Sequence, residues 1–191
     1  FVVMVGGTRA DAETLWDEVA AVLATIGLRL STEKTRVCHI DDGFDFLGWR
    51  IQRQSWHGRS GKRVLYTYPS KKALRAVMAK VRSLTRRNKH RKLADLLRAV
   101  NRTLQGWCAY FRHGVSARTF SYLDHFTWWR IFGWLRKRHV GLNKGTLVKR
   151  FLPRWEIRDG RVELFRPEQM PITRYRFRGA RIPTPWASKA T

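Results

Sequence analysis

Large aromatic side chains alternate with strong cations between Leu104 and His139. Residues 104–114 read LQGWCAYFRHG, and residues 134–139 read WLRKRH. Guanidinium and ammonium groups bind phosphate oxygens, whereas aromatic rings fill a core or stack on nucleic-acid bases. The combination is typical of a protein that binds a nucleic-acid backbone.

The side chains that could serve in catalysis or bind a metal ion are scattered along the chain. The densest acidic group is Asp41, Asp42 and Asp45, beside Gly43. Two-metal catalysis needs a cluster of carboxylates, and Asp is common in tight turns for structural reasons, so we expect these acids to be structural. No metal-ligand spacing relates the histidines His39, His57, His113, His125 and His139. The sequence therefore predicts no metal site.

The chain carries a large positive charge for its 191 residues. It has 39 Lys and Arg against 14 Asp and Glu, a formal net charge of +25. A compact body with this charge repels itself unless a polyanion neutralises it, so we expect RNA or DNA as the partner. A solvated basic surface and an anionic membrane surface are the alternatives. Membrane insertion is not expected, because no run of about 18 apolar residues occurs.

Two further properties bear on location and on the start of the chain. Cys38 and Cys108 form no CxxC pair, which favours a reducing, cytoplasmic location. The chain does not begin with Met but inside the apolar run Phe1–Val5, which we interpret as a buried strand of a longer protein. The sequence leaves the oligomeric state of the protein open.

The first third of the chain predicts a small antiparallel sheet with one packed helix. Thr8 can cap a helix over residues 8–27, with Asp11 at the third helical position and Gly27 at its end. Its apolar stripe includes Leu15, Trp16 and Val19. Short strands are predicted at residues 1–5, 28–30, 36–40, 44–51 and 64–68, with a hairpin turn at Asp41–Gly43.

The rest of the chain predicts a helical bundle followed by a short hairpin. Apolar residues recur at helical spacing over residues 70–87, 93–111, 116–139 and 144–151, with Ser70 and Ser116 as caps. A hairpin is predicted over residues 156–165, followed by an extended basic tail. Aromatic residues at helical spacing are more often core than base-stacking platforms, so we assign four rings to the core: Trp107, Phe111, Phe120 and Trp134. The predicted fold class is α+β.

The order of motifs resembles that of group II intron-encoded reverse transcriptases with maturase activity. The resemblance rests on FVVM at residue 1, GLRLSTEKT at 27, GFDFLGW at 43, GWCAYFRHG at 106 and WLRKRH at 134. It implies the end of a palm domain over residues 1–68, thumb helices over 69–104, a maturase-specific domain X over 105–155 and a basic hairpin and tail over 156–191.

The resemblance also implies roles for the palm residues. Lys34 would act as a general acid toward the departing pyrophosphate. Phe46, Leu47, Gly48 and Trp49 would form the primer grip. The metal-binding aspartates of the family precede the point at which this sequence starts, so Mg²⁺ is implied for the full-length polymerase and no cofactor for this chain. We therefore expect this chain alone to bind RNA without polymerising.

Cations on the predicted helices are the candidate nucleic-acid contacts. The expected partners are group II intron RNA and an RNA template–DNA primer duplex, with shape and backbone recognised more than base sequence. The candidates are Lys71, Lys72, Arg75, Lys80, Arg82, Arg86, Arg87, Arg112, His113, Arg118, Arg130, Arg136, Lys137 and Arg138.

Three alternative functions remain open at this point. One is a reverse transcriptase of another retroelement without splicing activity. A second is a standalone RNA-binding splicing factor or RNA chaperone without polymerase activity. A third is a basic architectural protein that binds any duplex.

Overall fold

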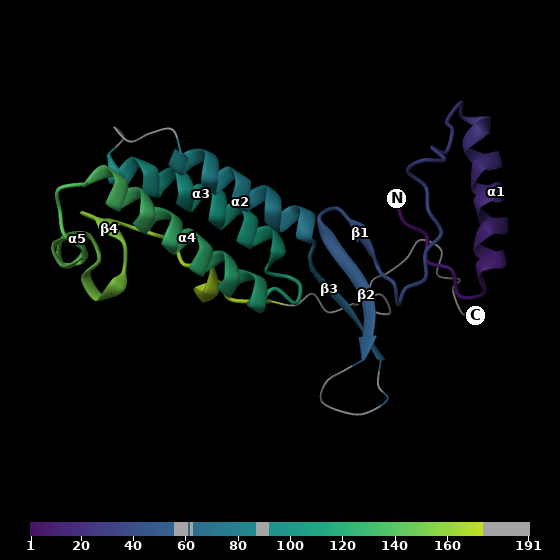
Figure 1. The fold of residues 1–191 in the computed structure, drawn as a ribbon. Helices are drawn as coiled ribbons and strands as arrows, with labels where there is room; N and C mark the ends of the chain where they lie inside the picture. Colours follow the sequence, from purple (N-terminus) through teal and green to yellow (C-terminus); the bar gives the residue numbers. More distant parts are fainter. Residues whose placement is uncertain (56–60, 62, 87–91, 174–191) are drawn as a thin grey trace, which may run out of the picture. The chain divides into compact units, whose positions relative to one another are not determined.

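The computed structural model describes residues 1–55, 61, 63–86 and 92–173 (Figure 1). The chain divides into two compact units, Phe1–Ala73 and Leu74–Thr191. Residues 56–60, 62, 87–91 and 174–191 lie outside the described residues, and they include His57, Arg87 and most of the predicted basic tail. The predicted α+β class is confirmed, because the first unit contains a sheet and the second is mainly helical.

An antiparallel sheet of β1 (Phe44–Phe46), β2 (Trp49–Ser55) and β3 (Arg63–Pro69) forms the described strands of the first unit. Phe46 pairs with Trp49, so Leu47 and Gly48 are the two central residues of a tight turn. Both have positive φ, 48° and 83°. This conformation matches the twist of a two-residue hairpin, and it suits Gly48 much better than Leu47.

Several strand predictions in this unit are wrong. Residues 1–5, 28–30 and 36–40 are not strands, and the apolar residues Phe1–Val5 are exposed rather than buried. The hairpin turn lies at Leu47–Gly48, not at Asp41–Gly43. Apolar alternation alone does not make a strand, because the backbone groups also need a neighbouring strand to bond with, and β1–β3 pair with one another instead.

The helix of the first unit is α1 (Arg9–Thr25). Its predicted cap is confirmed, because the Thr8 hydroxyl accepts from the Asp11 N–H while the Asp11 carboxylate accepts from the Thr8 N–H. Leu15, Trp16 and Val19 are only half-buried, and no residue of this helix is fully buried. The cap fixes where the helix begins, and packing adds little to its stability.

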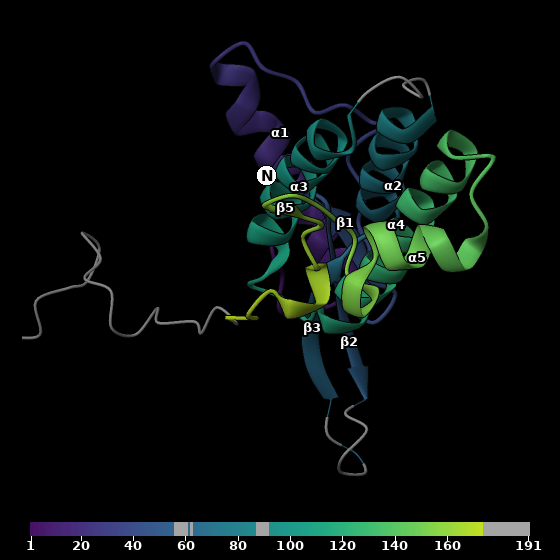
Figure 2. The same cartoon turned by 90° about the vertical axis from the view of Figure 1, so that its left-hand side faces the viewer.

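The second unit is built on three long helices that lie side by side (Figures 1 and 2). They are α2 (Lys71–Arg86), which begins in the first unit, α3 (Leu93–Phe111) and α4 (Ala117–Arg138). Their apolar faces meet in one core, whose fully buried members are Val81, Leu96, Leu97, Val100, Leu104, Leu123, Ile131 and Leu135. The predicted helical stripes are therefore confirmed.

The helix ends show which predicted caps are correct. The Ser70 hydroxyl accepts a hydrogen bond from the Ala73 N–H at 3.1 Å and caps α2 as predicted. Ser116 does not cap α4 with its side chain, and that prediction is wrong. The Ser116 hydroxyl instead donates to the Phe111 carbonyl at 2.5 Å, at the end of α3. The Ser116 side chain therefore satisfies a carbonyl at the end of α3 instead of an N–H at the start of α4.

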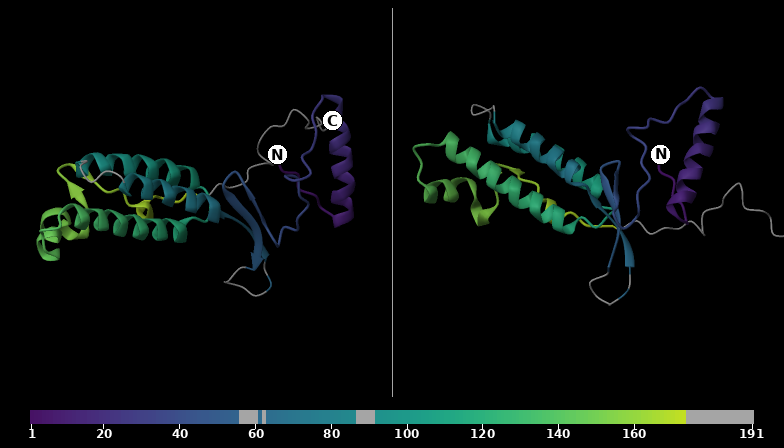
Figure 3. Two further views of the ribbon diagram at one scale, coloured as in Figure 1. Left: turned by 45° about the horizontal axis from the view of Figure 1, so that its top comes forward. Right: turned by 45° about the vertical axis from the view of Figure 1, so that its right-hand side comes forward.

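The C-terminal segments complete the core of the bundle. They comprise α5 (Lys144–Phe151), η1 (Pro153–Trp155), β4 (Arg158–Asp159), β5 (Val162–Glu163) and η2 (Pro167–Gln169), seen at one end of the bundle and along it in Figure 3. Leu147, Leu152 and Ile157 are each 1% exposed and belong to the same hydrophobic cluster as the long helices. The predicted hairpin is confirmed by the pairing of Asp159 with Val162.

Candidate nucleic-acid interface

The cations of α2 lie on its outer surface. Lys71, Lys72, Arg75, Lys80, Arg82 and Arg86 are all exposed, and the helix contains no Asp or Glu. Arg75, Arg82 and Arg86 recur at helical spacing and share one side of α2. Their charges are therefore not offset by acids on the same helix.

Two contacts show that this side of α2 faces α4. The Arg82 guanidinium lies 5.0 Å from the centre of the Phe126 ring of α4, and Arg130 Nε of α4 donates to Thr85 Oγ1 at 2.8 Å. A ring face and a hydroxyl hold these guanidinium groups in place without neutralising them. Lys137, two helical turns after Arg130, shares the side of α4 that faces α2.

These five cations form a surface that we call the α2–α4 seam: Arg75, Arg82, Arg86, Arg130 and Lys137. Among the described residues, the arginines that form ion pairs with carboxylates lie outside this seam: Arg9, Arg50, Arg53, Arg63, Arg98, Arg158 and Arg166. Because charge that lacks an acidic partner attracts polyanions, the seam can bind phosphate groups.

The remaining predicted cations of the second unit differ in their surroundings. Arg118 and Arg136 are exposed on α4. Arg138 is half-buried, and its guanidinium lies 5.2 Å from the centre of the Trp134 ring. Arg138 therefore contributes to packing as well as to the surface charge.

Arg112 and His113 hold the segment that follows η2. Arg112 Nε donates to Thr173 Oγ1 at 3.0 Å, and the Thr173 N–H donates to the Arg112 carbonyl at 3.1 Å. His113 Nδ1 lies 3.0 Å from the Thr173 carbonyl oxygen, and such a bond requires the ring nitrogen to donate. These side chains thus have internal partners, and a contact with RNA stays a prediction.

The predicted palm residues lie in the first unit. Phe46 and Trp49 are paired strand residues on either side of the Leu47–Gly48 turn, and Leu47 is 70% exposed. Lys34 is an exposed residue in a turn after α1. Among the described residues, no hydrogen bond or ion pair links Lys34 to the Leu47–Gly48 turn, so the roles of Lys34 in catalysis and of the turn in primer binding stay predictions.

The acidic group of the first unit forms ion pairs. Asp41 accepts from Arg53 Nε at 2.6 Å and from Arg63 Nη1 at 2.6 Å. Hydrogen bonding from Arg53 lowers the pKa of the Asp41 carboxyl below its ordinary value. Asp45 lies 3.3 Å from Arg50 Nη1. Among the described residues, no three His, Cys, Asp or Glu side chains gather as metal ligands would, so these acids do not fit a Mg²⁺ site.

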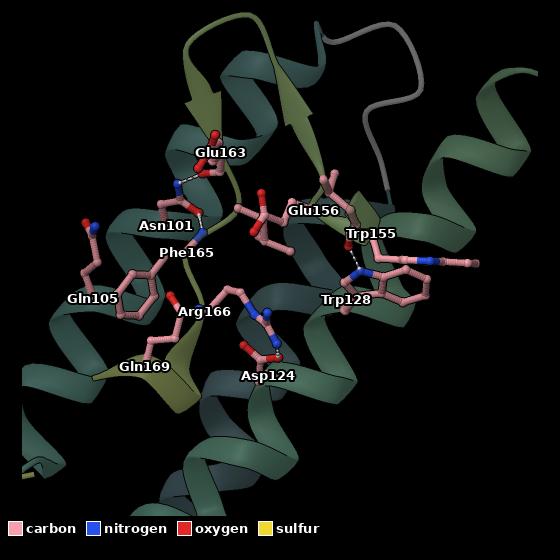
Figure 4. Close-up of a pocket in the computed structure, with 12 residues that line it drawn as sticks. Asn101, Gln105, Asp124, Trp128, Trp155, Glu156, Glu163, Phe165, Arg166 and Gln169 are labelled. Carbon is pink, nitrogen blue, oxygen red and sulfur yellow. Dashed lines mark hydrogen bonds and ion pairs between the residues drawn. The ribbon is translucent and has the colours of Figure 1, made fainter. Parts of the chain in front are cut away.

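The structure brings together a polar cluster that was not predicted, between α3, α4 and the C-terminal segments (Figure 4). Asn101 Nδ2 donates to the Glu163 carbonyl at 2.6 Å, and Asn101 Oδ1 accepts from the Phe165 N–H at 2.8 Å. Asp159 Oδ2 accepts from the Ala94 N–H at 3.0 Å, at the start of α3, where Lys92 provides no side-chain cap. The C-terminal hairpin is thus fastened to α3 by hydrogen bonds.

A cavity of about 260 Å³ lies within this cluster and contains the buried acid of α4. Asp124 is 9% exposed, and Arg166 Nη2 lies 3.4 Å from its Oδ2. Burial raises the pKa of the Asp124 carboxyl, although Arg166 acts in the opposite direction. Burial likewise raises the pKa of the Cys108 thiol to about 12, so Cys108 is an inert core residue.

None of the helices in the described part of the chain is both long and apolar enough to cross a bilayer.

A comparison with protein-family models matches part of the second unit, and a comparison with curated proteins finds a relative. Residues 74–155 match the family model described as group II intron, maturase-specific domain. Protein YkfC of Escherichia coli (strain K12) is 41% identical over 90 residues, which cover 43% of this chain and 23% of that protein. The chain thus spans less than a quarter of the length of this relative. The family model begins in α2 and ends at Trp155, and it confirms the resemblance first seen in the motifs.

Proposed function

We propose that this chain binds structured group II intron RNA through the α2–α4 seam and thereby assists splicing. One observation carries the proposal: the guanidinium groups of Arg82 and Arg130 are positioned by a ring and a hydroxyl instead of by carboxylates. Their orientation is fixed before binding, and their charge is available to phosphates.

The two helices that carry the seam are joined by a common core. Val81 of α2 and Ile131 of α4 are both completely buried in it. Cations on such a frame keep fixed spacings, which favours a folded RNA with phosphates at matching positions over an extended strand. Cations on a mobile tail would have no such preference.

A role in RNA-templated DNA synthesis is the further part of this proposal. It is supported by the order of motifs in the first unit and by the exposed Leu47–Gly48 turn, which would contact the template–primer duplex. The described acids do not fit a magnesium site, so no catalytic step is assigned to them. Lys34 would neutralise the departing pyrophosphate in the full-length polymerase.

Binding of the whole chain to a folded group II intron RNA, measured at several salt concentrations, tests the proposal. We expect log affinity to fall with log salt by roughly 0.7–0.9 for each phosphate neutralised. The triple variant Arg75→Gln, Arg86→Gln, Lys137→Gln should bind more weakly and show a shallower slope, because each of these exposed side chains belongs to the seam.

A second triple variant controls for the loss of net charge. Arg9, Arg98 and Arg158 are each paired with a carboxylate, at 2.7, 2.7 and 3.8 Å. Changing all three to Gln removes the same formal charge, yet it should leave the salt slope nearly unchanged. Equal losses in the two variants would rule out the seam as the binding surface.

Competition with unrelated RNA separates this function from the alternatives. A maturase should prefer the folded intron to bulk RNA and should promote intron splicing in vitro. A general architectural protein should show no preference among duplexes. A retroelement reverse transcriptase without maturase activity should bind template–primer but not accelerate splicing.

A further inference from the structure

The outer face of α4 exposes two large aromatic side chains. Tyr122 is 54% exposed and Trp129 is 53% exposed. They lie two helical turns apart, about 10 Å along the axis, and therefore on the same side of the helix. The core of the bundle lies on the opposite side, where Phe120, Leu123 and Ile131 are buried.

Trp129 is held in place although more than half of its surface is exposed. Its ring makes edge-to-face contacts with His125, Trp128 and Phe132, with centroid separations of 6.1, 5.0 and 5.9 Å. Contacts of this kind restrict the rotamers of the ring. A ligand that stacks on Trp129 would therefore lose little of its binding energy to ordering the side chain.

The neighbour that supports Trp129 is itself anchored. Trp128 Nε1 donates to the Trp155 carbonyl at 3.0 Å, and its ring stacks on Phe132 with a centroid separation of 5.1 Å. Trp128 and Trp155 both appear at the edge of the cavity in Figure 4. The rings beneath Trp129 thus belong to the fixed part of the fold.

The charges on this face indicate what could bind to it. Arg118 and Arg136 are exposed and share the side of α4 that carries Tyr122 and Trp129. Asp124, the only acid in α4, lies on the inner side, where it is buried and paired with Arg166. A row of exposed rings lies between these two arginines, and the carboxylate ion pairs of the described residues involve other cations. Such a row is complementary to a chain that carries both anions and planar groups.

We propose that this face, defined by Arg118, Tyr122, Trp129 and Arg136, stacks unpaired bases of RNA while the arginines bind the flanking phosphates. The inference rests on the proposed function and narrows it, because it assigns phosphates of folded RNA to the seam and single-stranded loops or bulges to the outer face of α4. Every base offers a π face, so the face accepts unpaired bases with little sequence preference. An intact duplex offers such faces only at its ends.

Two RNA probes test the proposal with the whole chain. One is a stem-loop with 2-aminopurine in the unpaired loop, and the other is the same stem as a blunt duplex with 2-aminopurine in a base pair. Stacking on Trp129 should quench the fluorescence of the loop probe. Trp129→Ala should weaken loop binding about tenfold and abolish the quenching, with less than a twofold change for the duplex. Tyr122→Ala should act in the same direction more weakly.

Two further variants make the result specific to stacking. Trp129→Phe keeps a ring and should restore most of the loop affinity. Tyr110 on α3 is 48% exposed, so Tyr110→Ala removes a ring of similar exposure from another helix and should leave the quenching intact. Unchanged thermal unfolding of the Trp129 variants shows that the bundle is preserved, as expected for a side chain outside the buried core.

The outcomes separate this inference from the proposed function. If the wild-type chain binds both probes and Trp129→Ala binds the loop as well as the wild type does, the stacking face is wrong and the seam remains. An equal loss on loop and duplex would also overturn it, because that pattern indicates contact with the phosphate backbone instead of base stacking. Failure of the wild-type chain to bind any structured RNA would overturn both proposals.

Discussion

The two units of the molecule differ in how their helices are stabilised. In the first unit, α1 has a complete capping box, yet none of its residues is fully buried. In the second unit, α4 lacks a side-chain cap at Ser116, yet eight of its residues are buried. Local hydrogen bonds thus define where a helix begins, whereas a shared core supplies most of its stability. The difference predicts that equivalent substitutions will have very different costs in the two units.

The largest difference should come from truncating apolar side chains. Leu97 of α3 is completely buried, so Leu97→Ala should lower the free energy of unfolding by about 2–5 kcal/mol. Leu15→Ala in α1 should cost less than about 1 kcal/mol, because Leu15 is only half-buried. Denaturant unfolding of the two variants measures this. Similar losses would mean that α1 packs as tightly as the bundle does.

A smaller effect is expected from the hydrogen bonds that fasten the C-terminal hairpin. Asn101→Ala removes one bond to the Glu163 carbonyl and one from the Phe165 N–H, and it should cost about 1–3 kcal/mol. Thr8→Ala removes the cap of α1 and should cost about 1 kcal/mol at most. Hydrogen exchange of the Phe165 amide should rise in the first variant. No change in its protection would show that Asn101 is dispensable.

The next prediction compares cations with and without an acidic partner. Arg86 is exposed on the α2–α4 seam, whereas Arg63 is paired with Asp41 at 2.6 Å. Arg86→Gln should reduce the salt slope of RNA binding by roughly 0.7–0.9, the contribution of one phosphate contact. Arg63→Gln should leave it nearly unchanged. Titrations of both variants against the same RNA decide the matter, and a larger effect of Arg63 would contradict the comparison.

The smallest predicted effects concern the pH dependence of stability, and they have opposite signs in the two units. Burial raises the pKa of Asp124 in the second unit, so the stability linked to its protonated form is present below about pH 4 and is lost as pH rises through the folded pKa. Hydrogen bonding lowers the pKa of Asp41 in the first unit. The stability linked to the Asp41 carboxylate is therefore present above about pH 4 and is lost as pH falls.

Substitution of each aspartate with Asn tests the two pH dependences of stability separately. Asp124→Asn should be at least as stable as the wild type near neutral pH, and the difference should vanish in acid. Asp41→Asn should lose its ion pairs and be less stable near neutral pH, with the difference also vanishing in acid. Chemical unfolding across this pH range measures both, and the same sign for the two variants would contradict the assigned causes.

Helical periodicity predicted the bundle well because each helix carries its own signal. The bounds of α2, α3 and α5 agree closely with the predicted ranges, and Phe111, Phe120 and Trp134 are buried as expected. Strands were predicted poorly, since a strand exists only where a neighbour accepts its hydrogen bonds, and that neighbour is not encoded in the strand itself. The short apolar runs before residue 41 illustrate this failure.

The candidate site was predictable in residue type but not in surroundings. The sequence identified Arg82, Arg112 and Arg130 as candidate contacts with nucleic acid. Only the fold shows that Arg82 lies over an aromatic ring, that Arg112 bonds to the backbone of Thr173 and that Arg130 bonds to a hydroxyl. Asn101 and Asp159 act on partners more than sixty residues away in sequence, so no local pattern could reveal them. The exposure of Trp129 could not be predicted from the sequence. Aromatic residues occur on several sides of α4, so helical spacing alone does not separate its exposed rings from its buried ones.

The Asp159 cap of α3 has a consequence for the order in which the chain folds during synthesis. The acceptor for the Ala94 amide lies 65 residues further along the chain. A ribosome that has released α3 has not yet released its cap, so the first turn of this helix should stay frayed until the hairpin has emerged. A nascent chain that ends before Asp159 should be cleaved by proteases at the first turn of α3. A chain that extends past the hairpin should be protected there.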